Sequence, residues 1–321
     1  MAGLFSMVGK LVPVAFVFSA GAVFAGRGII AAEASKAFSE FAFRFAIPAY
    51  LMGSLYAADL RRVFNLAALG AYAATAVVSA GVVAGVARLQ GHGRRETALR
   101  IMAACQVNTA YVAVPVFGLL FGDVTPIFPV ILLQVCVLTT IVIAVMESVP
   151  GDGSHDAPST RAGVPGGVWA ALTTPLVLAC WVGIAANVAE IPAPHWILDS
   201  LSMAGSAASP VALFALGLHL GGAGLRLRGA GRDEYWLIGF KCLAFPLLAF
   251  AIAHWGFRLT GPWLAYMVIL AAMPSPQNLF IFAQTYDTEV DLAASAVVKS
   301  TIAALILLPL WAIFVPGVQR G

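Results

Sequence analysis

Long apolar stretches alternate with short polar segments along the whole chain. Each apolar stretch has about the 20 residues that a helix needs to cross a bilayer, which predicts an all-α integral membrane protein of ten transmembrane helices. The ten stretches are centred near Phe16, Pro48, Val77, Val112, Val137, Leu178, Leu213, Leu247, Leu270 and Leu305. Hydrophobic residues make up 61% of the chain and charged residues 10%, whereas a soluble domain has about 25% charged residues. Little chain remains for a soluble catalytic domain, so we do not expect an enzyme.

Four landmarks of the first half recur in the second half in the same order. Pro13 pairs with Pro175, Gly21 with Gly183 and Pro48 with Pro210, all at one constant offset, and Pro115 pairs with Pro276 at an offset shorter by a single position. The recurrence predicts two five-helix repeats, residues 1–148 and 168–321, joined by a Gly- and Pro-rich linker over residues 149–167. Because the first stretch has a counterpart in the sixth, we expect it to be retained as a helix rather than cleaved as a signal peptide.

The basic residues predict how the helices are oriented. The odd-numbered connections and the stretch ends beside them carry ten Lys and Arg residues, and the opposite face carries five. The positive-inside rule puts the ten, and the linker with them, in the cytoplasm, so both termini are expected outside the inner (cell) membrane. Five helices per repeat is an odd number, so the two repeats must have inverted topology.

The fourth and ninth stretches are the most polar ones, and both contain proline. Proline removes a backbone donor and disrupts the helix, so we expect two broken helices whose N-terminal half-helix ends face a common point, a geometry that suits a carboxylate. The alternative is that these residues only hold helices together. The candidate substrate-binding residues are Gln106, Asn108, Tyr111 and Pro115 in the fourth stretch and Ser275, Pro276, Gln277 and Asn278 in the ninth.

Two lysines lie deep within the eighth and tenth stretches. Lys241 and Lys299 are expected to attract an anionic substrate or to stand in for a coupling cation, although lysines in such positions also snorkel or pair structurally. Gln134, in the fifth stretch, is expected to lie away from the site. There is no Asp or Glu in residues 101–122 or 263–286, which disfavours a sodium–proton antiporter because its crossed helices need a titrating carboxylate. The sequence has no nucleotide-binding, hydrolase or metal-ligand motif, so no cofactor, metal or nucleic-acid partner is expected.

At these residues the chain resembles the auxin efflux carrier family and its bacterial malonate-transporter-like members. The resemblance covers nearly the whole length, and it is carried by the segments 12–26, 45–51, 108–122, 210–218, 272–286 and 300–310. It implies ten helices with crossed helices four and nine, as in sodium–proton antiporters. It also implies a homodimer in which helices one, two, six and seven form a scaffold. Helices 3–5 and 8–10 would form a transport domain that moves as an elevator.

The sequence therefore predicts a secondary transporter that exports a small organic carboxylate anion across the lipid bilayer. One rival is a sodium-coupled organic anion symporter of the bile-acid-transporter type, which would need oxygen ligands for sodium. The other is a membrane sensor that binds its ligand without transporting it. Sodium dependence and flux in proteoliposomes distinguish these alternatives.

Overall fold

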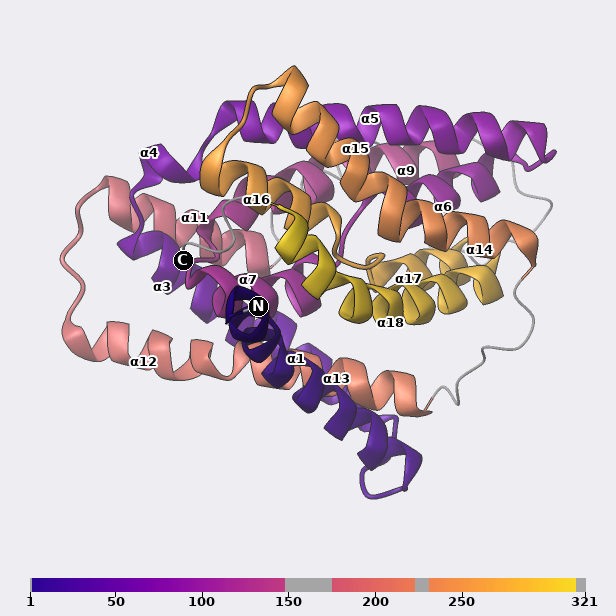
Figure 1. The fold of residues 1–321 in the computed structure, drawn as a ribbon. Helices are drawn as coiled ribbons and strands as arrows, with labels where there is room; N and C mark the ends of the chain where they lie inside the picture. The colour runs from indigo at the N-terminus through magenta and orange to yellow at the C-terminus, as the bar shows by residue number, and fades with distance from the viewer. Residues whose placement is uncertain (1, 148–174, 223–230, 316–321) are drawn as a thin grey trace.

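The computed structural model describes residues 2–147, 175–222 and 231–315, and the secondary structure in these ranges is entirely helical (Figure 1). The α-helices are α1 (Ala2–Gly26), α2 (Ala34–Phe41), α3 (Ile47–Ala57), α4 (Leu60–Val63), α5 (Leu66–Leu89), α6 (Arg94–Cys105), α7 (Val114–Phe121), α8 (Phe128–Leu132), α9 (Thr139–Glu147), α11 (Pro175–Val188), α12 (His195–Ser206), α13 (Ala208–Gly222), α14 (Arg232–Gly239), α15 (Phe245–Ala251), α16 (Gly261–Ala271), α17 (Asn278–Thr285) and α18 (Val290–Phe314). The predicted linker, residues 149–167, lies outside the described ranges.

Six helical stretches of the described chain are long and apolar enough to cross a membrane: Leu66–Leu89, Arg94–Phe121, Thr125–Met146, His195–Gly222, Asp233–Gly256 and Val290–Phe314. Three shorter apolar helices lie at Ala15–Gly26, Pro175–Val188 and Gly261–Ala271. These elements confirm an all-helical, multi-pass membrane protein. The count of ten transmembrane helices in two inverted repeats stays a prediction.

Several of the long helices contain a widened π turn, and three of these turns come just before a proline. The turns are η1 (Ala42–Ala46), η2 (Thr109–Ala113) and η5 (Phe240–Ala244), and each ends two residues before Pro48, Pro115 or Pro246. In each turn the residue before the proline donates its N–H to the carbonyl five residues earlier. A proline would otherwise clash with the preceding turn, and the wider turn relieves that crowding. The helices therefore continue through these three prolines.

Pro115 accordingly does not break the fourth stretch, contrary to the expectation from the sequence. The interruption comes earlier, at residues 106–108, between the end of α6 and the start of η2. Pro115 lies in the first turn of α7, where its missing N–H is tolerated. In the ninth stretch the interruption spans residues 272–277 and does include Pro276. We call these two segments the α6–η2 break and the α16–α17 break.

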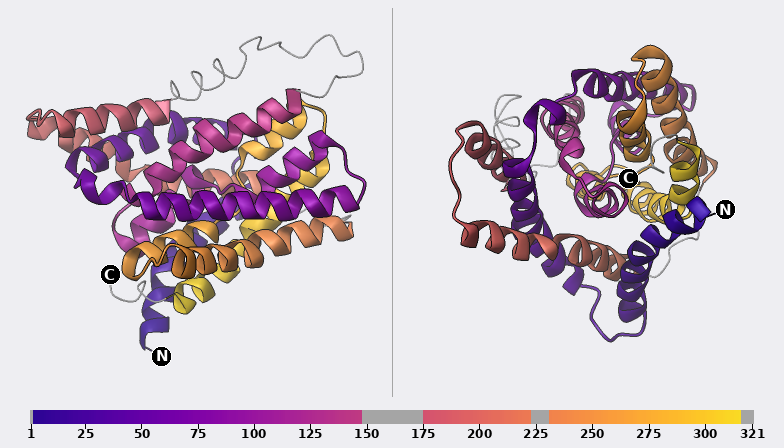
Figure 2. Two further views of the ribbon diagram at one scale, coloured as in Figure 1. Left: turned by 90° about the horizontal axis from the view of Figure 1, so that it is seen from above. Right: turned by 60° about the vertical axis from the view of Figure 1, so that its left-hand side comes forward.

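Two helix pairs on one side of the molecule pack backbone against backbone. A Cβ atom at Gly21 of α1 would overlap the Phe214 carbonyl of α13, and one at Gly183 of α11 would lie 2.6 Å from the Met52 carbonyl oxygen of α3. Only glycine allows helices in a membrane to approach this closely. Figure 1 and Figure 2 show α12 and α13 on the opposite side of the molecule from α5. The two breaks lie in the helices between these two sides.

Candidate functional site

The α6–η2 break and the α16–α17 break meet inside the molecule. The backbone N–H of Asn108 donates to the Pro274 carbonyl over 2.9 Å, and the Ser275 hydroxyl donates to the Ala103 carbonyl over 2.7 Å. The backbone N–H of Ser275 is in turn bonded to the Ser300 hydroxyl of α18, at 3.1 Å. Two interrupted helices thus satisfy part of each other's freed backbone groups, as an apolar environment requires.

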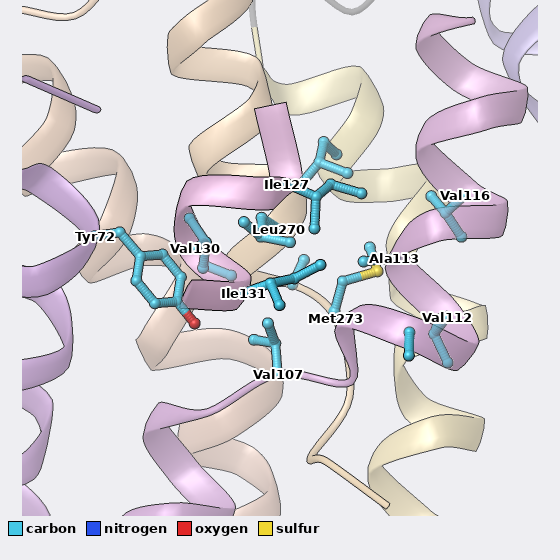
Figure 3. Close-up of a cluster of buried hydrophobic side chains, with 14 of the residues drawn as sticks. Tyr72, Val107, Val112, Ala113, Val116, Ile127, Val130, Ile131, Leu270 and Met273 are labelled. Atoms are coloured by element: carbon cyan, nitrogen blue, oxygen red, sulfur yellow. The ribbon is translucent and has the colours of Figure 1, made fainter. Parts of the chain in front are cut away.

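Apolar side chains surround this meeting point. Figure 3 shows Val107 and Met273, one from each break, packed with Ile131 of α8 and Leu270 of α16. All four side chains are at most 2% exposed. Burying a polar group among apolar side chains without a hydrogen-bond partner costs free energy. We therefore expect each polar group at the breaks to have a partner in the protein or in a ligand.

Gln134 of η4 (Leu133–Leu138) holds the α6–η2 break in place. Its Oε1 accepts from the Val107 N–H over 2.6 Å, and its Nε2 donates to the Val107 carbonyl over 3.5 Å. The Tyr72 hydroxyl lies 3.4 Å from both Gln134 Oε1 and the Cys105 carbonyl. The expectation that Gln134 lies away from the site is therefore wrong. Gln134 bonds to Val107, which belongs to the preceding apolar stretch. The signal in the sequence that could have identified Gln134 is a polar side chain within an apolar stretch.

Lys241 binds the C-terminal end of α6. Its ammonium donates to the Gln106 carbonyl over 2.8 Å, lies 4.4 Å from the centre of the Phe245 ring, and belongs to a side chain that is 1% exposed. The end of a helix carries free carbonyls and the negative end of the helix dipole, and a lysine there is stabilising. The structure thus brings Lys241 to the break.

Asn108 has a fixed amide with a free donor. Its Oδ1 accepts from the Tyr111 N–H over 3.1 Å, capping η2, so its Nδ2 must point elsewhere. That Nδ2 is buried and has no hydrogen-bond partner among the described residues. Gln106 Nε2 and Gln277 Oε1 are likewise buried and without a hydrogen-bond partner among the described residues. The Oε1 of Gln106 accepts from the Thr139 hydroxyl over 3.2 Å. Buried polar atoms left unpaired in this way are candidates for contact with a ligand.

The remaining candidates lie around this centre. Pro276 is buried in the α16–α17 break, and Gln277 beside it is half-buried. Tyr111 stacks on Phe43, with ring centres 6.3 Å apart. Asn278 is exposed at the start of α17, unlike the buried Asn108.

Lys299 is engaged elsewhere. Its ammonium forms an ion pair with Glu234 over 2.7 Å and lies 5.3 Å from the centre of the Tyr235 ring. The Ser295 hydroxyl also bonds to Glu234. Because its charge is already compensated, Lys299 is not a free cation for an anionic ligand.

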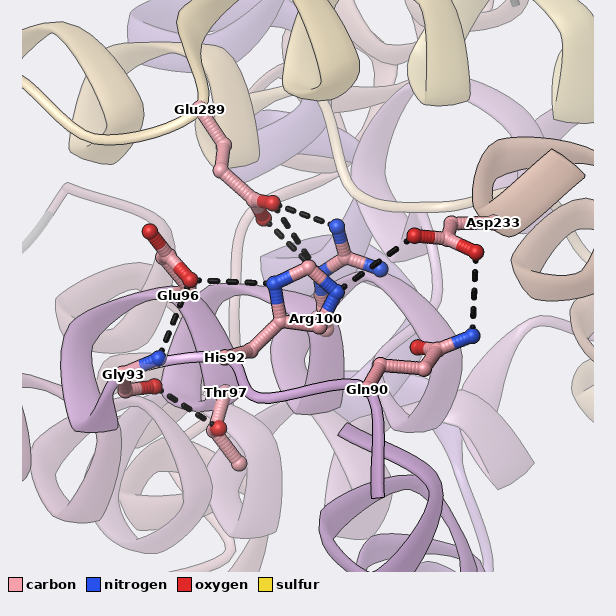
Figure 4. Close-up of polar contacts among 8 residues, drawn as sticks. All are labelled: Gln90, His92, Gly93, Glu96, Thr97, Arg100, Asp233 and Glu289. Atoms are coloured by element: carbon pink, nitrogen blue, oxygen red, sulfur yellow. Dashed lines mark hydrogen bonds and ion pairs between the residues drawn. The ribbon is translucent and has the colours of Figure 1, made fainter. Parts of the chain in front are cut away.

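A second polar cluster joins the ends of α6, α14 and α18 (Figure 4). Both Glu289 oxygens accept from Arg100 Nε, at 3.1 and 3.0 Å, and Arg100 is only 4% exposed. His92 lies 3.0 Å from Glu96 and 3.5 Å from Asp233. Arg100 therefore does not belong with the solvated basic residues counted for the orientation. Without Arg100, nine basic residues remain on the predicted cytoplasmic face against five on the opposite face, so the predicted orientation is unchanged.

An apolar helical bundle in which two interrupted helices meet is typical of membrane transport proteins. The chain belongs to the membrane transport protein family, that of the auxin efflux carriers, whose profile matches residues 6–312. It is 27% identical over 290 residues to a protein of Methanothermobacter thermautotrophicus named "Uncharacterized transporter", covering 89% of this chain and 91% of that one. It is 26% identical over 129 residues to a Rhizobium meliloti protein named "Putative malonate transporter", covering 40% of this chain and 39% of that one.

Proposed function

We propose that the protein is a secondary transporter that exports a small organic carboxylate, held where the α6–η2 and α16–α17 breaks meet. The observation that carries the proposal is Asn108 Nδ2, a buried donor with no partner in the described chain. A carboxylate accepts hydrogen bonds only and would satisfy it. Gln106 Nε2 offers a second donor at the same break.

The charges at the α6–η2 break favour an anion on one side of it. The C-terminal end of α6 is neutralised by Lys241 through the Gln106 carbonyl. The helical run that begins at Thr109 presents its positive end on the other side, next to Asn108. A carboxylate beside Asn108 would interact favourably with this positive end.

The relatives suggest which carboxylates to test first. The name of the Rhizobium meliloti relative refers to malonate, a small dicarboxylate. We therefore propose short dicarboxylates as the first substrates to test, with monocarboxylates as the comparison.

The proposed architecture is ten helices in two inverted five-helix repeats, with helices four and nine crossed. The glycine contacts support it, because Gly21 and Gly183 occupy equivalent repeat positions and play equivalent roles. Gly21 joins the first helix to the seventh, and Gly183 joins the sixth to the second. Those four helices are the proposed scaffold of a homodimer, against which helices 3–5 and 8–10 would move as an elevator in the inner membrane.

A sodium-coupled symporter of the bile-acid type is the nearest alternative. Lys241 weighs against it, because an ammonium already binds the helix end where a coupling cation would otherwise be stabilised. We expect replacement of sodium by potassium to leave flux unchanged in proteoliposomes. A flux that disappears without sodium would favour the symporter, and binding without any flux would favour a sensor.

The test of the site is the substitution Asn108→Asp. An Asp keeps an oxygen that can accept from the Tyr111 N–H, but it removes the free donor and places a negative charge there. We expect the affinity for a dicarboxylate to fall by about 1–3 kcal/mol, roughly 5- to 150-fold, while the protein still folds. Asn187→Ala is the matched control, because Asn187 Nδ2 donates to three backbone carbonyls of the α3 end and contacts neither break. Unchanged affinity in Asn108→Asp would place the substrate elsewhere.

A further inference from the structure

A cavity of about 700 Å³ lies away from the two breaks, between the end of α3, the connection from α7 to α8 and the start of α16. Its volume is within the range of small-molecule sites. Three aromatic side chains, Tyr50, Trp263 and Tyr266, line it together with Asp59 and Asp123. Among the lining residues whose side chains the structure describes, none is basic. We call it the acidic cavity.

The aromatic side chains of the acidic cavity pack against neighbouring rings and against α7. The Tyr266 ring lies edge-on to Phe121 with ring centres 4.8 Å apart, and edge-on to Trp263 at 5.5 Å. The Tyr50 hydroxyl lies against Gly118 of α7, 3.3 Å from where a Cβ would stand. All three lining rings are half-buried, so each presents part of its surface to the cavity.

Asp123 supplies a negative charge to the lining of the acidic cavity. It is exposed, and its Oδ1 accepts from the Thr125 N–H and hydroxyl, at 2.9 and 2.8 Å. Both bonds end on the same oxygen, so Oδ2 is left for another partner. Asp59 is followed by Arg61 and Arg62 and also has a partner of its own, so we assign the counter-charge for a ligand to Asp123.

Asp123 has a carboxylate oxygen without a bond from Thr125, and it lines the cavity together with three aromatic rings. This combination suits a cation rather than the anionic substrate proposed above. Ring faces attract quaternary and primary ammonium groups electrostatically, and a cleft lined by negative charge concentrates cations. We propose that the acidic cavity binds an organic ammonium ion, with its charge facing Asp123 and its alkyl groups against Trp263 and Tyr266. This site is separate from the carboxylate site and does not depend on it.

The test is a binding titration of the purified full-length protein with benzyltrimethylammonium. Neopentylbenzene, which has the same shape without the charge, is the ligand control. We expect saturable binding of the ammonium ion only. Trp263→Leu is expected to weaken it about fivefold to thirtyfold.

The second variant is Asp123→Asn, in which the amide oxygen can still accept from Thr125. We expect affinity to fall roughly twofold to tenfold, as for a charge at a solvated rim, and the salt dependence of binding to diminish with it. Asn108→Asp should leave ammonium binding unchanged, which separates this site from the carboxylate site. Equal binding of the neutral compound, or wild-type affinity in both Trp263→Leu and Asp123→Asn, would overturn the proposal.

Discussion

Replacing Gln134 by Leu should loosen the α6–η2 break while leaving the volume of the side chain nearly unchanged. The substitution removes the acceptor of the Val107 N–H, which is bonded over 2.6 Å. Val107 is 2% exposed, so water does not replace the lost partner. An unpaired buried donor costs about 1–3 kcal/mol. The second bond, from Gln134 Nε2 to the Val107 carbonyl, is 3.5 Å long and contributes little.

We therefore expect Gln134→Leu to lower the free energy of unfolding by about 1–3 kcal/mol. Affinity for the carboxylate should fall as well, because Asn108 directly follows Val107 and its position depends on this break. Equilibrium unfolding in mixed micelles measures the first effect, and a binding titration measures the second. Each must be compared with wild type under the same detergent conditions.

Gln90→Leu is the matched control for this measurement. Gln90 is exposed and bonds to Asp233 over 3.0 Å at the end of α5. Its loss should change stability by no more than about 0.5 kcal/mol, as for most surface substitutions. If Gln134→Leu is as mild as Gln90→Leu, the amide does not hold the break and the reasoning about buried partners is refuted.

Three further predictions concern the charges, the helix contacts and the orientation. Lys241→Gln keeps a donor for the Gln106 carbonyl but removes the charge, so the affinity for a carboxylate should fall roughly tenfold. Lys299→Gln breaks the ion pair with Glu234, away from the breaks. It should lower the free energy of unfolding and leave the affinity unchanged. Gly183→Ala places a Cβ 2.6 Å from the Met52 carbonyl oxygen, so it should lower the free energy of unfolding by about 1–3 kcal/mol. The control is Gly85→Ala, in a helix with open space around that position. It should leave the free energy of unfolding unchanged or raise it. A cysteine at Ser159 should resist an impermeant thiol reagent in intact cells if the linker is cytoplasmic, and ready labelling would reverse the predicted orientation.

Much of the fold could be predicted because a membrane leaves few choices. Length and hydropathy predict the helices, and the polar residues of the fourth and ninth stretches mark where helices are interrupted. The exact place of an interruption was harder to predict. Pro115 is tolerated because η2 widens the turn before it. Pro13 and Pro309, by contrast, lie inside α-helices, so a proline in an apolar stretch does not by itself predict a π turn.

Pairing across the chain was the main feature that sequence reasoning could not supply. Lys241 and Lys299 look alike in the sequence, as single cations within apolar stretches. Their roles differ because Lys241 faces a broken helix end in the other half of the chain, whereas Lys299 faces Glu234 in its own half. The partner of each lysine depends on how the helices pack, and helix packing cannot be predicted from a single sequence without its relatives.

The position equivalent to Lys241 in the first repeat carries no charge. The offset that relates Pro13 to Pro175 also relates Ser79 of α5 to Lys241, and Ser79 is fully buried with a hydroxyl that has no partner among the described residues. The equivalent position in the other half is therefore neutral, so this pair of repeat positions supplies one ammonium, that of Lys241. That ammonium binds the α6–η2 break, and the same break holds the buried, unpaired donor of Asn108, whereas Asn278 at the other break is exposed. The ammonium and the unpaired buried donors, Gln106 Nε2 and Asn108 Nδ2, thus lie at one break, whereas the unpaired atom of the other break, Gln277 Oε1, is an acceptor. We therefore expect the carboxylate to contact the α6–η2 break.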